Sequence, residues 1–190
     1  MATSGKKRGS VEFEETHLRI ATAALDLIVT SGIQGCDVRS VAQAAEVSTA
    51  TLRSHYPGGK QQYLVAAAES APVFAASDPL TGTPRERIAA YVAGAMKFAP
   101  RIATLLSEAT LHEPEFPEFA AAVRKVMTDR RLHIQEFLDR LGSSARPEAS
   151  PDVLLWLATG AVQAESLGDG IPLRKRRELI VDVASRLILK

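Results

Sequence analysis

A short polar stretch, VSTATLRSHY at residues 47–56, contains the side chains whose types and spacing are best suited to chemistry. Its larger apolar residues, Leu52 and Tyr56, are four positions apart and would share one face of a helix. The other side chains include hydroxyls, one guanidinium and one imidazole, which can hydrogen-bond to phosphate oxygens and base edges. No acidic residue lies between Glu46 and Glu69, so a polyanion could approach. The pattern predicts a short helix with one face suited to nucleic acid.

Two further helices would position this polar helix. Residues 16–31 repeat apolar side chains at helical spacing. A second short helix begins after Asp37, a good N-cap, and a tight turn around Glu46 leads to Ser48 or Thr49 as the next cap. Two short helices joined by a tight turn and braced by a longer one make a helix-turn-helix unit. Spacing alone leaves a plain surface helix as an equal alternative.

The composition places the chain among all-α proteins. Hydrophobic residues make up 46% of the 190 residues, charged residues 24% and aromatic residues 5%, and the apolar positions follow helical spacing. A net charge of +1 argues against a strongly basic coat protein but permits a small basic face. Cys36 is the single cysteine, the N-terminus lacks the apolar segment of a signal peptide, and no apolar run has the length of a membrane span. We therefore expect a soluble cytoplasmic protein.

The chain divides most clearly at SDPLTGTPRE, residues 77–86, which is rich in Pro, Gly, Ser and Thr. We expect a disordered basic arm over residues 1–15, a helix-turn-helix DNA-binding domain over 16–77 and a ligand-binding and dimerisation domain over 78–190. Proline near first-turn positions marks several helix starts in the second half. The start and stop signals predict about nine helices in all. Those of the second half cover residues 84–98, 100–111, 116–141, 151–167 and 172–189.

Residues 24–64, ALDLIVTSGIQGCDVRSVAQAAEVSTATLRSHYPGGKQQYL, resemble the DNA-binding head of the TetR family of bacterial transcriptional regulators. The family pattern has a Gly-hydrophobic-x-Gly turn after the first helix, an apolar-Ala pair, an Ala-Gly-Val-Ser turn, a Leu-Tyr-x-His-Phe core and a Lys that opens the fourth helix. The corresponding residues here are Gly32, Ile33, Gly35, Asp37, Val41, Ala42, Ala45, Val47, Ser48, Leu52, His55, Tyr56 and Lys60. The resemblance implies an all-α fold with an N-terminal three-helix helix-turn-helix head and a C-terminal helical bundle body.

Three features depart from the family pattern. Glu46 stands where the family has Gly, so the turn must accept a side chain at some cost in backbone strain. Arg53 replaces a frequent Tyr, which exchanges a hydroxyl contact to phosphate for a charged one. PGGK is one residue longer than the commoner Pro-Ser-Lys, which puts the placement of Lys60 in question. None of the three removes the motif.

The resemblance also implies a set of DNA contacts. Arg39 would reach a base edge or a phosphate, and bidentate binding to guanine is the most specific case. The residues that would approach bases or phosphates on or beside the polar helix are Ser48, Thr49, Ala50, Thr51, Arg53, Ser54, His55 and Lys60. Of these, Thr49, Ala50 and Ser54 would face bases, and Thr51, Arg53, His55 and Lys60 would hold phosphates. The arm residues Lys6, Lys7 and Arg8 could enter a minor groove, with a disordered solubilising tail as the alternative.

The body would join two copies and bind an effector. A homodimer is needed for two heads to read a pseudo-palindromic operator. Its expected interface lies on the last two helices, at Trp156, Ala158, Ala161, Ala164, Leu179, Ile180, Val183, Ala184 and Leu187. The candidate lining of a pocket for an unknown small, largely apolar effector is Met96, Phe98, Leu105, Leu111, His112, Phe116, Phe119, Met127, His133, Phe137 and Gln163. For each of these residues, ordinary core packing is the competing explanation.

The resemblance therefore implies a ligand-responsive homodimeric regulator, with repression favoured over activation, and no cofactor or metal. The alternatives are a helical adaptor that binds only protein, and a ferritin-like metalloprotein. Against the second, Glu108 and His112 are four apart and no Glu-x-x-His pair occurs. We find no phosphate-binding Gly-rich loop and no nucleophile elbow, so we expect no enzyme.

Overall fold

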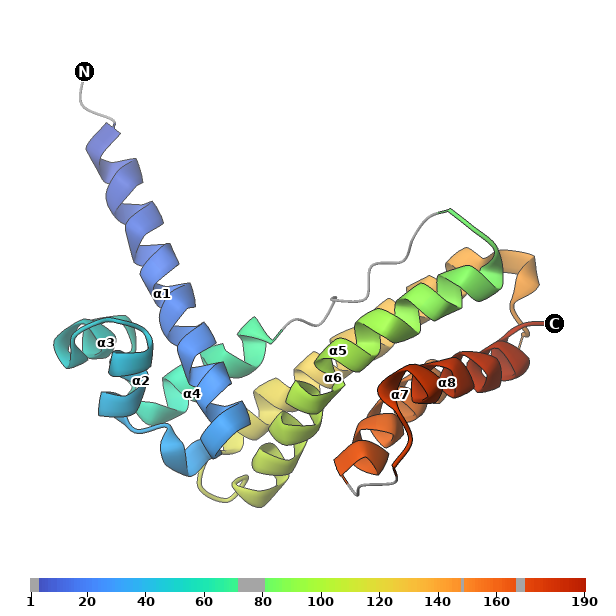
Figure 1. Ribbon diagram of the computed structural model, residues 1–190. Helices are drawn as coiled ribbons and strands as arrows, with labels where there is room; N and C mark the ends of the chain where they lie inside the picture. Colours follow the sequence, from blue (N-terminus) through green and yellow to red (C-terminus); the bar gives the residue numbers. More distant parts are fainter. Residues whose placement is uncertain (1–3, 72–80, 148, 167–169) are drawn as a thin grey trace. The chain divides into compact units, whose positions relative to one another are not determined.

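The computed structural model describes residues 4–71, 81–147, 149–166 and 170–190. These residues form eight α-helices and two short 3-10 helices: α1 (Ser4–Ser31), η1 (Ile33–Gly35), α2 (Val38–Ala44), α3 (Thr49–His55), α4 (Lys60–Ser70), α5 (Pro84–Leu111), α6 (Pro117–Leu141), η2 (Gly142–Ser144), α7 (Pro151–Ser166) and α8 (Leu173–Ile188) (Figure 1). The prediction of an all-α fold is confirmed. Among the described residues, no helix combines the length and the apolar character that a membrane span requires.

The helices belong to two compact units. The first contains residues 1–71 and 104–126, and the second contains residues 72–103 and 127–190. Helices α5 and α6 therefore contribute residues to both units. This grouping differs from the expected division after residue 77, because the end of α5 and the start of α6 pack with the N-terminal helices. That division into folding domains stays a prediction.

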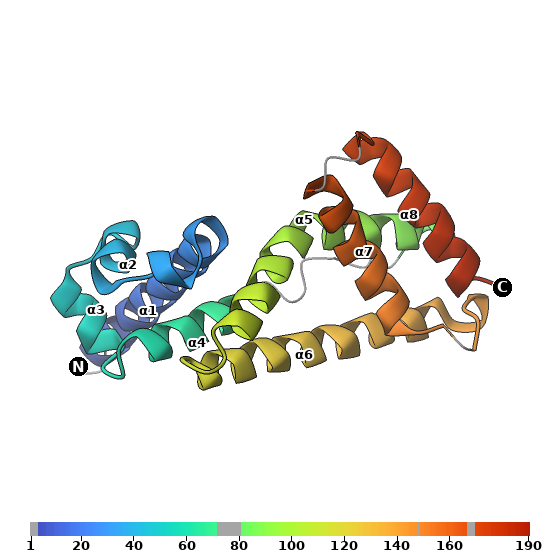
Figure 2. The ribbon, with the colours of Figure 1, turned by 90° about the horizontal axis from the view of Figure 1, so that it is seen from below.

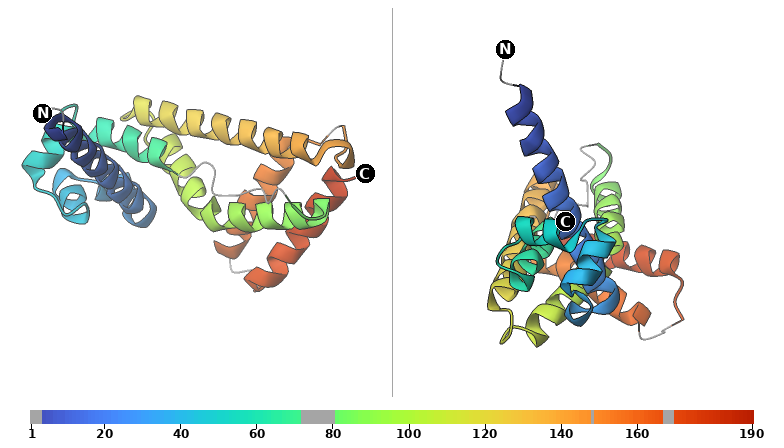
Figure 3. Two further views of the ribbon diagram at one scale, coloured as in Figure 1. Left: turned by 90° about the horizontal axis from the view of Figure 1, so that it is seen from above. Right: turned by 90° about the vertical axis from the view of Figure 1, so that its left-hand side faces the viewer.

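The first unit is built around α1. Its apolar residues Ile20, Ala24 and Ile28 repeat every four positions and are fully buried, as their spacing predicts. Helix α4 packs along α1, and α2 and α3 lie beside them (Figures 1 and 3). Helix α4 ends at Ser70, before an Ala71 in extended conformation, which is the conformation that a following proline imposes.

Helix α1 is longer than the sequence predicts. We expected a disordered arm through residue 15, but this was wrong for residues 4–15, which are helical. Glu12, Glu14 and Glu15 are good helix formers, and the Phe13 ring stacks on His55 of α3 with 4.1 Å between ring centroids. This contact gives the first turns of α1 a tertiary partner that composition does not reveal. The side chains of Lys6, Lys7 and Arg8 lie outside the described residues.

Helix α5 also differs from the prediction, because it runs without a break through Pro100. A proline inside a helix removes one backbone hydrogen bond and costs about 3 kcal/mol or more. Apolar residues on both sides of it, including Ala95, Ala99, Ile102 and Leu105, are buried. Their burial offsets the lost bond, and the described residues form eight α-helices where the sequence predicts about nine.

The second unit has one apolar core to which four helices contribute. Its buried residues are Ile88, Tyr91, Val92 and Ala95 of α5, Ile134, Phe137, Leu138 and Leu141 of α6, Leu154 and Leu155 of α7, and Ile180, Val181, Ala184 and Ile188 of α8. Helices α7 and α8 lie side by side in Figure 2 and are in contact. The Arg146 N–H donates to the Ile188 carbonyl at 2.6 Å, which fastens the end of α8 to the loop after α6.

Candidate nucleic-acid interface

The inward side of α3 fixes its position in the first unit. Leu52 is fully buried, and Tyr56, which follows the helix, is 1% exposed. The Tyr56 hydroxyl donates a hydrogen bond of 2.9 Å to the carbonyl of His17 on α1, and the two rings stack. Both residues therefore pack on the inner face, as their spacing predicts.

Side-chain caps begin both helices of the pair. The Asp37 carboxylate accepts hydrogen bonds from the N–H groups of Arg39 and Ser40 and from the Ser40 hydroxyl. These bonds, chiefly those from Ser40, lower the pKa of Asp37. The Ser48 hydroxyl accepts from the Thr51 N–H at 2.9 Å and also bonds to the Thr51 hydroxyl. Each cap satisfies backbone donors that the first helical turn leaves free.

The turn between α2 and α3 has the geometry of a Schellman motif. The Val47 N–H donates to the Ala42 carbonyl at 2.9 Å, and the Glu46 N–H donates to the Gln43 carbonyl at 3.1 Å. This arrangement requires a left-handed residue at the centre, and Glu46 adopts φ 54°. Glutamate therefore occupies a position that favours glycine, and the turn keeps its shape at a cost in backbone strain.

The outward side of α3 carries the side chains expected to meet DNA. Thr49, Ala50, Arg53 and Ser54 are exposed; at about 100° per residue Ala50 and Ser54 lie opposite Leu52, and Arg53 and Thr49 lie on the flank between the two faces. Arg39 on α2 is exposed as well. Within the described part of the chain, the side chains of Arg39, Thr49 and Arg53 make no hydrogen bond or ion pair. Their donors are therefore available to a partner.

Three other hydroxyls of the set are already engaged within the protein. Those of Ser48 and Thr51 bond to each other, and that of Ser54 donates to the Thr51 carbonyl at 2.8 Å. Thr51 is half-buried, and Ser48 and Ser54 are exposed. The Ser54 oxygen can still accept a hydrogen bond, while its proton is in use.

His55 does not lie on the outward face. Its side chain is buried, with 9% of the residue exposed, and stacks on Phe13. Burial, and to a lesser degree the neighbouring charge of His17, lower its pKa. The prediction that His55 holds a phosphate was therefore wrong, because Phe13 covers the ring. The spacing of Phe13 and His17 by four residues is a local sign that the first helix reaches residue 13, but it does not reveal the partner on α3.

Lys60 begins α4 and is half-buried. Its ammonium nitrogen lies over the ring of Phe116, 5.4 Å from the centroid, in a cation–π arrangement. Contact of Lys60 with a phosphate would compete with this arrangement, and it stays a prediction.

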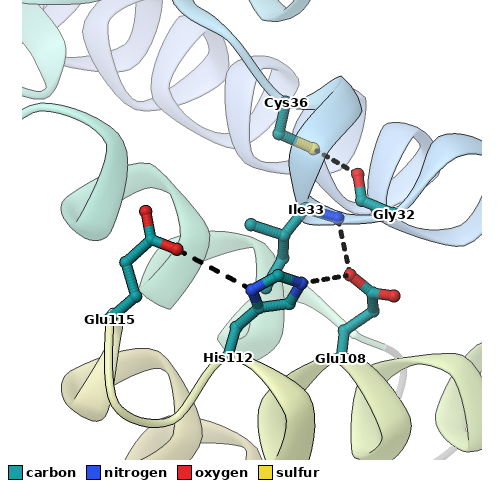
Figure 4. Close-up of polar contacts among 6 residues, drawn as sticks. All are labelled: Gly32, Ile33, Cys36, Glu108, His112 and Glu115. Carbon is teal, nitrogen blue, oxygen red and sulfur yellow. Dashed lines mark hydrogen bonds and ion pairs between the residues drawn. The ribbon is translucent and has the colours of Figure 1, made fainter.

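The turn after α1 rests on the end of α5 (Figure 4). One Glu108 carboxylate oxygen accepts the Ile33 N–H at 2.7 Å and lies 3.7 Å from the His112 Nε2 atom. A Cβ added to Gly32, which has φ 67°, would lie 3.1 Å from the same oxygen. Glu108 therefore holds a turn that only glycine fits well. In the sequence, Glu108 is visible only as a partner of His112, because the contact with Ile33 joins residues far apart in the chain.

The Cys36 thiol lies in the same region and is fully buried. It donates to the carbonyls of Ala24 and Gly32 at 3.6 Å each, and Figure 4 shows the second contact. Burial raises its pKa to about 11, so the thiol is neutral near pH 7 and is a poor nucleophile.

The candidate effector residues fall in different parts of the fold. Leu105, Phe116 and Phe119 are buried in the first unit, Phe137 is buried in the second, and Leu111 is 71% exposed. Met96, Phe98, His112, Met127 and His133 are half-buried, and the side chain of Gln163 lies outside the described residues. For the buried phenylalanines, core packing is the role that the structure shows. Met96 lines a groove between α5 and α8.

The candidate dimer residues divide into two faces of α8. Leu179, Val183 and Leu187 are exposed, as is Trp156 on α7 with 71% of its surface free. Ile180 and Ala184 instead belong to the core of their own unit, so their assignment to an interface was wrong for this chain. They lie on the neighbouring side of the helix, which packs against α5, α6 and α7. The side chains of Ala158, Ala161 and Ala164 lie outside the described residues.

Comparison with known proteins shows which fold this is. No family model matches the chain, and no curated protein matches it. A putative TetR-family transcriptional regulator from Rhodococcus sp. is similar over 92% of this chain and 99% of its own, with a TM-score of 0.69 and 16% identity. A TetR transcriptional regulator from Chloroflexus aurantiacus is similar over 94% of this chain and 99% of its own, with a TM-score of 0.69 and 18% identity. A transcriptional regulator from Rhodococcus sp. Rha1 is similar over 90% of this chain and 94% of its own, with a TM-score of 0.65 and 20% identity. The chain has the fold of TetR-family transcriptional regulators.

Proposed function

We propose that the protein is a DNA-binding transcriptional regulator that inserts α3 into the major groove. The observation that carries the proposal is the outward face of α3, where Thr49, Ala50 and Arg53 are exposed. The helix is capped, braced from behind by Leu52 and Tyr56, and free of acidic side chains. Short side chains let the helix backbone approach base edges closely, and the fold matches that of regulators whose heads share this layout.

The proposed contacts fall into two classes. Arg39 and Thr49 read base edges, with Ala50 placed to touch a thymine methyl group. Arg53 holds a phosphate and fixes the register of the head on the duplex without reading sequence. Ser54 can accept from a base or a bound water. Ser48 and Thr51 keep the helix end in shape, since their hydroxyls bond to each other.

We place two such heads in a homodimer. The exposed residues Leu179, Val183 and Leu187 recur every four positions on α8 and form a continuous apolar stripe, and Trp156 adds a large apolar surface on α7. Pairing α7 and α8 with the same helices of a second copy across a two-fold axis gives a four-helix interface. A symmetric pair of heads then matches a pseudo-palindromic operator.

Regulation in this proposal comes from a small effector that binds the body in the cytoplasm. An effector acts only if it binds one arrangement of the heads more tightly than another. We propose that effector binding releases the protein from DNA, so that the protein acts as a repressor.

The test is a fluorescence-anisotropy titration of the full chain with labelled DNA from upstream of its own gene. We expect saturable binding that weakens steeply with added salt. Arg39→Ala should relax the base preference at one position, as measured against a panel of single-base variants of the operator. A helical adaptor that binds only protein predicts no DNA affinity at any salt concentration, and that result would overturn the proposal.

Dimerisation has its own test. Val183→Glu places a charge in the centre of the proposed stripe, and we expect sedimentation to show a monomer with unchanged helicity. Leu132→Glu is the matched control because it also replaces an exposed apolar residue by Glu, on α6 and not on α8. If Val183→Glu stays a dimer, the stripe is not the interface.

A further inference from the structure

A groove lies between α5 and α8 in the second unit, and none of the residues proposed to contact DNA lines it. It has a volume of about 360 Å³, which is within the range of small-molecule sites. Its lining consists of Ala93, Met96 and Lys97 from α5, and Leu173, Arg174 and Arg177 from α8. The groove therefore has apolar walls and three cationic side chains, and none of the described residues that line it is acidic.

The groove lies on the side of α8 that packs in the core, at the beginning of the helix, where that side is no longer buried. At about 100° per residue, Leu173 and Arg177 lie on the same face of α8 as Ala184, which is fully buried. At the first turn of α8 this face carries Leu173, which is 56% exposed, where later turns carry core residues. An apolar ligand segment placed there would remove this leucine and Met96 from water, as the core does for the residues that follow.

The three cations differ in how far they are already engaged. Arg174 pairs with Glu178, with 3.0 Å between Nε and Oε1. Lys97 lies over the Phe98 ring at 5.5 Å, and Arg177 makes no ion pair within the described part of the chain. A ligand with an acidic group would therefore find two cations, Lys97 and Arg177, with which no described carboxylate forms an ion pair.

We propose that this groove binds an amphipathic monoanion, a molecule with a carboxylate head held by Lys97 and Arg177 and an apolar tail against Met96 and Leu173. Charge complementarity selects the head, and apolar burial selects the tail. The inference rests on the proposed function only in that this ligand would be the effector. Binding of the ligand itself does not depend on DNA.

A second copy of the chain is the competing occupant. The apolar stripe of Leu179, Val183 and Leu187 lies about 100° around α8 from the groove face, so a dimer formed through the stripe leaves the groove on another side. If the groove were instead a dimer contact, ligand binding would compete with dimerisation. Sedimentation with and without ligand distinguishes these cases.

The direct test is titration calorimetry of the full chain with decanoate below its micelle concentration. Decanol and decyltrimethylammonium share the tail and serve as neutral and cationic comparisons. Lys97→Ala and Arg177→Ala should each weaken decanoate binding about tenfold, since each removes one charge-assisted contact. Lys175→Ala is the matched control, because it removes an equal charge from an exposed position on α8 that does not line the groove. Leu173→Ser should weaken binding several-fold without unfolding, since this side chain is more than half exposed.

Four outcomes overturn the inference: no saturable decanoate binding, equal affinity for decanol, unchanged binding by the double variant Lys97→Ala/Arg177→Ala, or dissociation of the dimer by decanoate. The DNA titration separates this inference from the proposed function. Decanoate binding that follows the expected variant pattern in a chain without DNA affinity keeps the ligand site and rejects the regulator. If the chain binds DNA but does not bind decanoate, the regulator is kept and the ligand site is rejected.

Discussion

Arg53→Ala gives the sharpest test of how the protein would meet DNA. The guanidinium is exposed on the outward face of α3 and makes no ion pair within the described part of the chain. Removing it should therefore leave the fold unchanged and delete one phosphate contact per head, or two in a dimer. Each phosphate contact contributes about 0.9 to the slope of log affinity against log salt. The variant should lower the magnitude of that slope by about 1.8.

This change in slope predicts how the affinities of the two proteins diverge. Between 50 and 200 mM salt, a fourfold change, wild type should lose about twelve times more affinity than Arg53→Ala. At the lower salt concentration, loss of two charge-assisted contacts should weaken the variant at least about tenfold. Because phosphates carry no sequence information, the loss should be nearly equal on operator and unrelated DNA.

The assay is fluorescence anisotropy with the operator fragment and an unrelated fragment at four salt concentrations, with circular dichroism to confirm the fold. Lys125→Ala is the matched control, because it removes an equal charge from an exposed position on α6. Equal slopes for wild type and Arg53→Ala would refute the phosphate contact. A loss confined to the operator would instead assign Arg53 to base reading.

The remaining predictions concern the support of this face. Glu46→Gly should raise the free energy of unfolding by about 1 kcal/mol in denaturant melts, because glycine adopts the observed φ of 54° without strain. Ala44→Gly, two residues earlier at the end of α2, should lower it. Gly32→Ala should lower the free energy of unfolding more than Gly142→Ala, because both residues have positive φ but only at Gly32 would the new Cβ meet the Glu108 carboxylate. Equal losses of stability would show that crowding by Glu108 has no effect. Burial lowers the pKa of His55, so the unfolded chain takes up its proton more readily. Stability should therefore be full above about pH 6.5 and fall as the pH drops through the folded pKa, and His55→Gln should lose less stability between about pH 7.5 and 5.5 than wild type.

Local features were the ones that the sequence predicted well. The caps Asp37 and Ser48 and the inward positions Leu52 and Tyr56 depend on residues within one helical turn, so their spacing was sufficient. The contact of Phe13 with His55 and that of Glu108 with Ile33 join distant parts of the chain. No local pattern reports such partners, and for this reason the arm was expected to be disordered and His55 to be exposed.

The two apolar faces of α8 show a different reason for error. Leu179, Ile180, Val183 and Ala184 all read as one broad apolar stripe in the sequence. The fold buries Ile180 and Ala184 in its own core and leaves Leu179 and Val183 on the surface. Hydrophobicity alone cannot separate the face that packs within the chain from a face that is free for a second copy. Only the direction from which α5, α6 and α7 approach makes this distinction.

Helix α3 has seven residues, which is too short for a helix to be stable in isolation. Its outward side chains contribute no packing, so its position depends on the Ser48 cap, on Leu52 and Tyr56, and on the stack of His55 with Phe13. Substitutions on the two sides of the helix must therefore act on different observables. Outward changes such as Arg53→Ala should alter DNA affinity at constant stability, whereas changes to the support should lower stability and DNA affinity together. This separation follows from the geometry of the helix, and it allows contact and support to be told apart by measurement.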